Sequence, residues 1–255
     1  MNFKQIAIKA AKEAGKIHLR YFGKYIRKEK KKGNSYFTKA DIESSVKIKD
    51  IITSHFPEHS IIDEELGKDK KNSDYRWIVD PLDGTHNFMI GNPIFGVSIA
   101  LEHKKEIILG VVYMPTLNRL YYAEKGKGAY CNGKRIKVNN EKKLRNSIAI
   151  FDSKLRDKAK IKLNILEKIA KVVWRIRIYG AAIYHNLLVA EGKVGLNIDF
   201  NSNPWDHSAA LLIVEEAGGK VTTLKGKKWN AYTKDYIASN GKLHDKVLKI
   251  IRPFL

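Results

Sequence analysis

The stretch that most constrains this chain runs from Trp77 to Phe88 and reads WIVDPLDGTHNF. Its apolar start predicts a buried strand, and the Pro, Asp and Gly that follow predict a turn. Asp80 and Asp83 therefore come at a strand end, which is where ligands bind in open α/β sheets. Gly84 and Thr85 can begin a helix whose backbone N–H groups face an anion. The stretch predicts a sheet whose strand end brings cations and a phosphate together.

The pattern of elements around this stretch predicts a layered α/β fold. Apolar residues spaced by three or four predict helices at 3–23 and 41–55, followed by short strands within 60–124. The second half is expected to alternate helices near 160–170, 181–191 and 204–217 with strands RIRI, KVGLNIDF and 236–238, before a helix from 243. Gly126 and Gly128 are predicted to be hairpin turns, because no apolar helix follows them. The expected seam near 140–146 divides the chain into an N-terminal half, 1–143, and a C-terminal half, 144–255.

Size and cysteine content limit the kind of protein further. The 255 residues are 44% hydrophobic, enough for a full core. No apolar run approaches the roughly 20 residues that span a bilayer, so a cytoplasmic protein without membrane contact is expected. Cys131 is the one cysteine, which rules out an internal disulfide and makes a thiolate metal cluster improbable. Any metal is expected to have oxygen ligands.

The charge of this chain is strongly positive, with 48 Lys and Arg against 27 acids, a net +21. Its densest basic run, 27–32, is short, and the other lysines are spread over expected surface faces. We therefore rank a solvated surface first, attraction of anionic substrates second and nucleic-acid binding third. Abundant Lys and Ile with few Cys and Met are also typical of thermophile proteins.

Acidic residues gather at the ends of three expected elements. Asp63, Glu64 and Glu65 follow a strand, the opening stretch supplies Asp80 and Asp83, and Asp206 lies in a first helical turn that Asn203 can cap. Each group alone could be an ordinary turn or cap. Together they are the oxygen ligands that Mg²⁺ takes along with substrate phosphate. Cations that neutralise a phosphate and an attacking hydroxide favour phosphate-ester hydrolysis.

Longer segments resemble one known family over nearly the whole chain. The segments are DEEL, WIVDPLDGTHNFMIGNPIFGVSIAL, GVVYMP, KGKGAYCNG, RIRIYGAA and NPWDHSAALLIVEEAGGKV, in that order. They resemble the inositol monophosphatase family of Mg²⁺-dependent, lithium-sensitive phosphatases. This resemblance implies a layered αβαβα sandwich of the inositol monophosphatase and fructose-1,6-bisphosphatase type, two or three Mg²⁺ ions and a homodimer.

The resemblance also implies roles for individual residues. The expected metal ligands are Glu64, Asp80, the Leu82 carbonyl, Asp83 and Asp206. The expected catalytic residues are Asp41, Glu64 and Thr85, of which Thr85 and Asp41 would orient the attacking water. The expected substrate-binding residues are Asp83, Gly84, Thr85, Gly180, Ala181, Ala182, Asp199 and Asp206. The basic loop Lys30–Gly33 corresponds to a segment that supports a further, weaker metal, and His86 is expected to be a surface residue or to lie just behind the ligands.

The substrate implied by the resemblance is a small phosphorylated polyol, with inositol monophosphate first. Fructose 1,6-bisphosphate and 3′-phosphoadenosine phosphate are the alternatives, and Arg175, Arg177 and Lys193 are candidate cations for a second phosphate. Attack by metal-activated water is expected to be direct, because no Ser, Cys or His stands out as a nucleophile. The rival from another class is a basic RNA-associated protein with a vestigial site.

Overall fold

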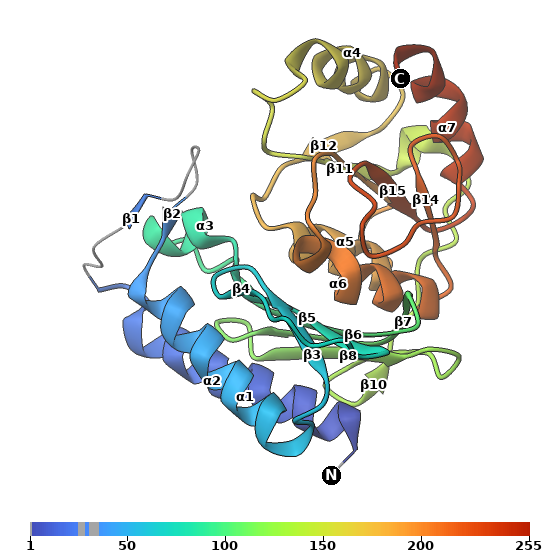
Figure 1. Ribbon diagram of the computed structural model, residues 1–255. Helices are drawn as coiled ribbons and strands as arrows, with labels where there is room; N and C mark the ends of the chain where they lie inside the picture. The colour runs from blue at the N-terminus through green and yellow to red at the C-terminus, as the bar shows by residue number, and fades with distance from the viewer. Residues whose placement is uncertain (1, 25–28, 31–35) are drawn as a thin grey trace.

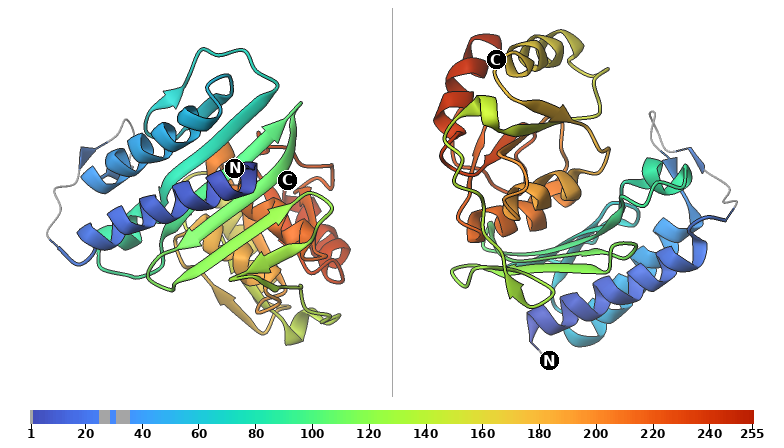
Figure 2. Two further views of the ribbon diagram at one scale, coloured as in Figure 1. Left: turned by 90° about the horizontal axis from the view of Figure 1, so that it is seen from below. Right: turned by 180° about the vertical axis from the view of Figure 1, so that it is seen from behind.

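The computed structural model describes residues 2–24, 29–30 and 36–255. Two long helices, α1 (Phe3–Tyr21) and α2 (Lys39–His55), cover one face of a large sheet. They lie side by side across the strands, as both views of Figure 2 show. Each helix begins with a capping box, from Asn2 in α1 and Thr38 in α2, which satisfies N–H groups that the first turn leaves unpaired.

The large sheet has eight strands in the order β10-β9-β8-β7-β6-β5-β3-β4. Neighbouring strands are antiparallel, except that β3 and β5 are parallel. The strands are β3 (Ser60–Asp63), β4 (Gly67–Lys68), β5 (Tyr75–Asp83), β6 (Gly96–His103), β7 (Glu106–Met114), β8 (Arg119–Glu124), β9 (Ala129–Cys131) and β10 (Lys134–Arg135). Gly126 and Gly128 lie in the turn between β8 and β9, which confirms the hairpin prediction.

The small sheet has five strands in the order β12-β11-β13-β15-β14. β11 runs parallel to β12 and β13, and β15 runs antiparallel to β13 and β14. The strands are β11 (Ile148–Phe151), β12 (Arg175–Arg177), β13 (Leu196–Asp199), β14 (Lys220–Thr223) and β15 (Tyr236–Ser239). Short elements complete the chain: β1 (Glu29–Lys30), β2 (Tyr36–Phe37), α3 (Thr85–Met89) and 3₁₀ turns at Leu144–Asn146 and Arg252–Phe254.

Helices separate the two sheets and cover the outer face of the smaller one. α5 (Ala182–Ala190) and α6 (Pro204–Glu216) lie between the sheets, while α4 (Ala159–Ala170) and α7 (His244–Ile251) lie outside the small sheet (Figure 1). The order of layers is α1/α2, large sheet, α5/α6, small sheet, α4/α7. The predicted αβαβα sandwich is therefore confirmed.

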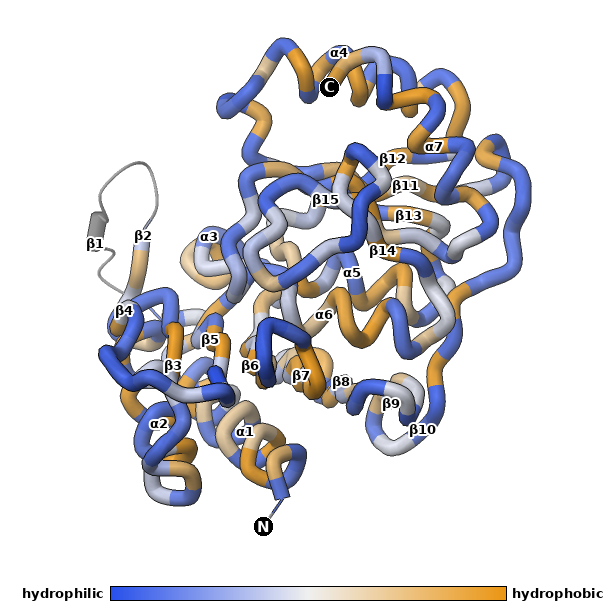
Figure 3. The backbone as a smooth tube through the Cα atoms, turned by 45° about the vertical axis from the view of Figure 1, so that its right-hand side comes forward, coloured by the Kyte–Doolittle hydropathy of each residue, from blue (hydrophilic) through white to orange (hydrophobic). Residues whose placement is uncertain are grey.

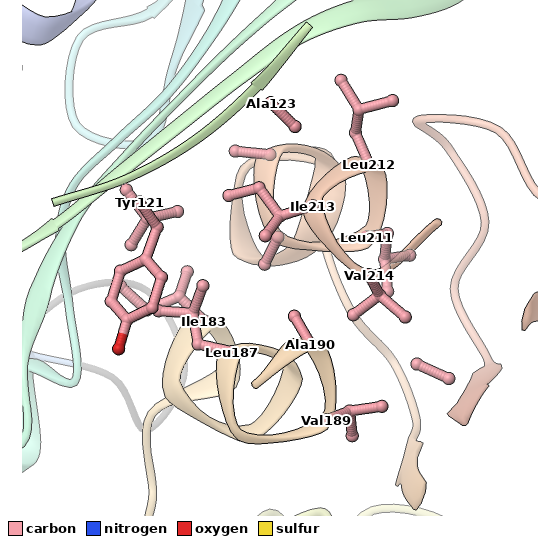
Figure 4. Close-up of a cluster of buried hydrophobic side chains, with 14 of the residues drawn as sticks. Tyr121, Ala123, Ile183, Leu187, Val189, Ala190, Leu211, Leu212, Ile213 and Val214 are labelled. Atoms are coloured by element: carbon pink, nitrogen blue, oxygen red, sulfur yellow. The ribbon is translucent and has the colours of Figure 1, made fainter. Parts of the chain in front are cut away.

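The central helix layer is apolar because it is buried on both sides. Residues of α6 from Ala209 to Val214 are at most 3% exposed, and the tube is orange along much of α5 and α6 in Figure 3. Figure 4 shows Ile183 and Leu187 of α5 gathered with Ile213 of α6 against the Tyr121 side of the large sheet. Burying several such side chains, at about 1.5–3 kcal/mol each, holds the two halves of the chain together.

The described helices include none that is long and apolar enough to cross a membrane. The large sheet ends at Arg135 and the small sheet begins at Ile148, so the boundary proposed at residue 143 falls in the segment that joins them.

Candidate active site

An irregularity in β5 brings Asp80 and Asp83 to the same cleft. Asp80 pairs with Ser98 of β6, but Asp83 pairs with Gly96, so the register shifts by one residue between them. In a regular strand, residues three apart point to opposite faces of the sheet. The extra residue acts as a β-bulge and reverses the direction of the side chains beyond it. Both carboxylates consequently face the same cavity.

This cavity is a cleft of about 630 Å³ between the two halves of the chain. In Figure 1 it corresponds to the junction where α3 and the end of β5 face the layer of α5 and α6. Eleven of the residues expected from the sequence line it: Glu64, Asp80, Leu82, Asp83, Gly84, Thr85, Gly180, Ala181, Ala182, Asp199 and Asp206. The structure therefore gathers into one cleft residues that are up to 142 positions apart, from 64 to 206.

Three carboxylates form the tightest cluster in this cleft. Oxygens of Glu64, Asp80 and Asp206 all lie within 4.8 Å of one another. Asp206 is placed by its own helix start, because the backbone N–H of Asn203 donates to its carboxylate at 2.8 Å in a capping box. The Asn203 cap and the first-turn position of Asp206 were both predicted from the sequence.

The three acidic residues at 63–65 lie in two different environments. Asp63 faces away from the cluster and accepts hydrogen bonds from the Ser45 hydroxyl at 2.7 Å and from the N–H groups of Glu65 and Leu66. The backbone N–H of Glu64 donates to the carbonyl of Val79 at 3.1 Å, which fixes Glu64 beside β5. Of this run, Glu64 is the residue that lines the cleft.

Asp83 joins the two halves of the chain through α5. The N–H groups of Ala182 and Ile183, in the first turn of α5, each donate to its carboxylate at 3.2 Å. A carboxylate at a helix N-terminus is stabilised by these unpaired donors and by the helix dipole. The same interaction fixes Ala182 at the wall of the cleft.

Crowding of acids in a buried site changes their protonation. Burial, and then the carboxylate of Asp206, raises the pKa of Asp83 to about 8. Burial also raises the pKa of Asp206 to about 6, although the nearby Lys154 ammonium opposes the shift. The pKa of Asp80 is likewise raised, by burial and by the charges of Glu64 and Asp83. Such a set of oxygens is stabilised by divalent cations, so it fits Mg²⁺.

Thr85 and Asp41 form the expected pair behind the cluster. The Thr85 hydroxyl lies 3.2 Å from Asp41 Oδ1 and 3.0 Å from the Leu82 carbonyl oxygen, so its single proton has two acceptors. The N–H and hydroxyl of Thr38 both donate to Asp41 Oδ2 at 2.7 Å. Asp41 is 1% exposed and held in a fixed orientation by the start of α2.

Gly84 lets the turn at the cleft lie close to the backbone of Ile94. Its φ is +82°, a conformation that L side chains rarely adopt, and a Cβ there would lie 2.8 Å from the carbonyl oxygen of Ile94. A side chain at this position is therefore excluded both by backbone conformation and by space. α3 begins at the next residue, which confirms the predicted helix start.

The cleft lining also contains residues that the sequence analysis did not identify. They are Tyr36, Asn87, His185 and a run after β11 that comprises Asp152, Ser153, Lys154, Arg156 and Asp157. The run matches no motif, so only tertiary placement reveals it. The cations suggested for a second phosphate are not in this lining: Lys193 pairs with Glu191 at 2.9 Å, and Arg175 and Arg177 lie on β12.

His86 and the basic loop complete the list of expectations. His86 lines the cleft and its ring lies 5.9 Å from the ring of Tyr36, while the metal-holding group found among the described residues consists of carboxylates alone. Of the loop Lys30–Gly33, Lys30 belongs to β1 and residues 31–33 lie outside the described part of the chain.

Comparison with known proteins agrees with this geometry. Residues 2–253 match the model of the inositol monophosphatase family. The chain belongs to this family. Members of this phosphatase superfamily are in general Mg²⁺-dependent. This protein is accordingly an enzyme that hydrolyses phosphate esters.

Individual members of the inositol monophosphatase family match over almost the full chain. A protein of Aquifex aeolicus named fructose-1,6-bisphosphatase/inositol-1-monophosphatase is 40% identical, covering 98% of this chain and 96% of its own. A putative Nus factor SuhB of Neisseria meningitidis is 35% identical, covering 98% and 97%. Among solved structures, the IMPase of Thermotoga maritima has a TM-score of 0.92 at 38% identity, covering 100% and 98%. The names of these relatives differ, so the family does not specify the substrate.

Proposed function

We propose that this protein hydrolyses inositol monophosphate to inositol and phosphate with Mg²⁺ as cofactor. The observation that carries the proposal is the cluster of Glu64, Asp80 and Asp206 oxygens within 4.8 Å, in a cleft that Thr85 also lines. The name of the Aquifex aeolicus relative includes inositol-1-monophosphatase and adds support. We further propose that the two halves divide at residue 143 and that the protein acts as a homodimer in the cytoplasm.

The residues proposed to hold Mg²⁺ are Glu64, Asp80, the Leu82 carbonyl, Asp83 and Asp206. When bound, such ions neutralise the phosphate and lower the pKa of water, which supplies a nucleophile at neutral pH. Burial of these carboxylates with little compensating positive charge supports their assignment, because a cation would relieve the repulsion that raises the pKa values of Asp80 and Asp83.

Other residues of the chain would position the reactants. The N–H groups of Gly84 and Thr85 would donate to the phosphate, and the Thr85 hydroxyl would orient a water in line with the ester bond. Asp41, hydrogen-bonded to that hydroxyl, would accept the proton as the water attacks, with Glu64 also taking part. The P–O ester bond breaks, the leaving oxygen takes a proton from water so that the polyol leaves as an alcohol, and Asp41 returns its proton to the solvent. Asp199 and Gly180–Ala182 would contact the hydroxyl groups of the polyol.

The direct test measures phosphate release from inositol 1-phosphate, fructose 1,6-bisphosphate and 3′-phosphoadenosine phosphate in parallel. We expect inositol 1-phosphate to be hydrolysed well in Mg²⁺ and activity to vanish in EDTA. If it is the poorest of the three by a wide margin, the substrate assignment is wrong.

A matched pair of variants tests the metal site. Removing a group that supports a metal ligand typically costs about 10–100-fold in activity. Asp83 is itself a proposed ligand, so Asp83→Asn should lower kcat/KM by at least about 100-fold. Asp245→Asn is the control, since Asp245 lies in α7 and forms a salt bridge with Lys220. Full activity in Asp83→Asn would refute the metal assignment.

Fructose 1,6-bisphosphate is the second candidate substrate, and the Aquifex aeolicus relative carries both names. Nucleic-acid binding, which the net charge of +21 could also serve, is the rival of another class. Electrostatic binding to RNA weakens steeply with salt and does not need the carboxylate cluster. RNA binding that persists in Asp83→Asn, in a protein without phosphatase activity in Mg²⁺, would favour the rival.

A further inference from the structure

Three polar side chains lie buried between the small sheet and α5, in a largely apolar layer. They are Asn186 of α5, Asn197 of β13 and Tyr236 of β15, and each is 0% exposed. Figure 3 shows α5 below β13 and β15, and α5 contacts both strands. We call these three side chains the buried polar triad. Burying a polar group is costly unless it is hydrogen-bonded, so apolar packing does not explain the buried polar triad.

Hydrogen bonds within the buried polar triad fix the orientation of the Asn186 amide. Its nitrogen donates to the Tyr236 hydroxyl at 2.9 Å and to the carbonyl of Ala182 at 3.1 Å. Its oxygen accepts from the amide nitrogen of Asn197 at 3.1 Å. An amide nitrogen carries two hydrogens, so both donors of Asn186 are used. Turning the amide over would place its oxygen against the Ala182 carbonyl, so the network specifies a single orientation.

The Ala182 carbonyl belongs to the first turn of α5, which also holds Asp83. The N–H of Ala182 donates to one carboxylate oxygen of Asp83 and the N–H of Ile183 donates to the other, each at 3.2 Å. Both oxygens of Asp83 are therefore tied to one turn of helix. Ala181 precedes α5 and has no polar side chain that could cap it. Asn186 instead holds this turn from within the helix, through the Ala182 carbonyl.

We propose that Asn186 is a positioning residue for Asp83. Its amide, anchored to the small sheet by the other two members of the buried polar triad, fixes the first turn of α5 and with it the direction of the Asp83 carboxylate. The inference rests on the proposed function, in which Asp83 is a ligand of Mg²⁺. Groups that orient metal ligands are worth about 10–100-fold in metal affinity or activity. Asn186 acts through one further hydrogen bond, so its contribution is expected at or below the lower end of that range.

Tyr236 allows this network to be perturbed without disturbing the packing around it. Its ring centre lies 5.3 Å from that of His207, which follows Asp206 in α6. The ring therefore packs against the start of α6, while the hydroxyl bonds to α5. Replacement by phenylalanine removes the hydroxyl and keeps the ring.

The test measures Mg²⁺ affinity by calorimetric titration in the absence of substrate. We expect Asn186→Leu, which is similar in size but lacks the amide, to raise the dissociation constant of Mg²⁺ at least about fivefold. Tyr236→Phe should raise it at least about twofold, because Asn186 keeps its bond to Ala182 in that variant. Saturating Mg²⁺ should restore kcat in both variants, so the Mg²⁺ concentration for half-maximal activity should change more than kcat does.

Ser239→Ala is the matched control for Tyr236→Phe. Ser239 lies on the same strand and is also 0% exposed, but its hydroxyl is hydrogen-bonded to Nδ1 of His244 in α7, at 2.8 Å. The control thus loses a buried hydroxyl from β15 on the side of the small sheet away from α5. It should lower stability and leave Mg²⁺ affinity unchanged. Unchanged affinity in Tyr236→Phe overturns the inference even if Asn186→Leu does not fold, and so does an equal loss of affinity in Ser239→Ala.

A double variant separates this inference from the proposed function. Mg²⁺ affinity in Asp83→Asn equal to that of the unaltered protein would refute the metal assignment and this inference together. If Asp83→Asn weakens binding, adding Tyr236→Phe should weaken it no further, because the network acts through Asp83. Additive losses in the double variant would overturn the inference alone and leave Asp83 as a ligand.

Discussion

Replacement of Gly84 by alanine tests the reasoning about the catalytic turn most directly. At φ +82°, an L residue costs about 1–2 kcal/mol relative to glycine. The new Cβ would also lie 2.8 Å from the Ile94 carbonyl oxygen and 3.3 Å from the Cα of Phe95. These are backbone atoms, which cannot rotate away. Overpacking of this kind costs a further ~1–3 kcal/mol, so we expect Gly84→Ala to lower the free energy of unfolding by about 2–5 kcal/mol.

Gly133 supplies a matched control. Its φ is +78°, nearly the same as that of Gly84, but a Cβ there would meet nothing within 4 Å. Gly133→Ala should therefore show the conformational cost alone, about 1–2 kcal/mol. For a chain of this size 1 kcal/mol moves Tm by roughly 2–4 °C, so thermal unfolding should separate the two variants by several degrees.

Activity provides the second readout for Gly84→Ala. Relief of the contact with Ile94 must move the turn, and with it the Thr85 hydroxyl that lies 3.2 Å from Asp41. A displacement of about 1 Å in a catalytic site can cost 100-fold, so kcat/KM should fall in Gly84→Ala and not in Gly133→Ala. Equal loss of stability in the two variants, with normal activity in both, would refute the argument from crowding.

Three further predictions concern stability. Lys162→Met leaves the carboxylate of Asp152 buried without its partner, so the free energy of unfolding should fall by about 3–5 kcal/mol in urea titrations, and a loss below 1 kcal/mol would contradict the buried pair. Burial lowers the pKa of His18 to about 3 from 6.5, so the neutral ring stabilises the fold above pH 6.5 and this contribution is lost as pH falls from 6.5 toward 3. His18→Leu should therefore flatten the decrease in urea midpoint between pH 7 and pH 4, and an unchanged slope would show that His18 does not cause it. Mg²⁺ at 100 times its dissociation constant should stabilise the folded protein by about 2.7 kcal/mol, measurable as a rise in Tm that NaCl of equal ionic strength does not reproduce.

Local signals account for the parts of the site that were predicted from the sequence. Asn203, Pro204 and Asp206 specify a helix start within four residues, and the structure contains the expected capping box. Gly84 and Thr85 likewise specify the turn and the beginning of α3 by their own conformational preferences. Such features depend on neighbours in the chain, which sequence patterns describe well.

Features that depend on tertiary contacts could not be predicted in the same way. Lys162 falls on an amphipathic helix, where a lysine is ordinarily assigned to solvent, and its burial depends on Asp152 and Phe200 from other elements. β11 and β14 were not identified, although strands of the same length were predicted at β3, β13 and β15. Lys154 and Arg156, which line the cleft, were not identified either, because basic residues give no local sign of which face they occupy.

The bulge in β5 has a consequence for how this segment tolerates changes in length. Asp80 and Asp83 are three residues apart, and they face the same cleft because the register with β6 shifts by one residue between them. Deletion of Pro81 or Leu82 would leave the two aspartates two residues apart, on one face of a regular strand, but would shorten the segment that leads into Gly84 and α3 by one residue. Substitution surveys alone would miss this requirement, because what matters is a count of residues rather than their identity. The spacing between the two carboxylates is thus itself a determinant of the site, sensitive to a single codon lost or gained.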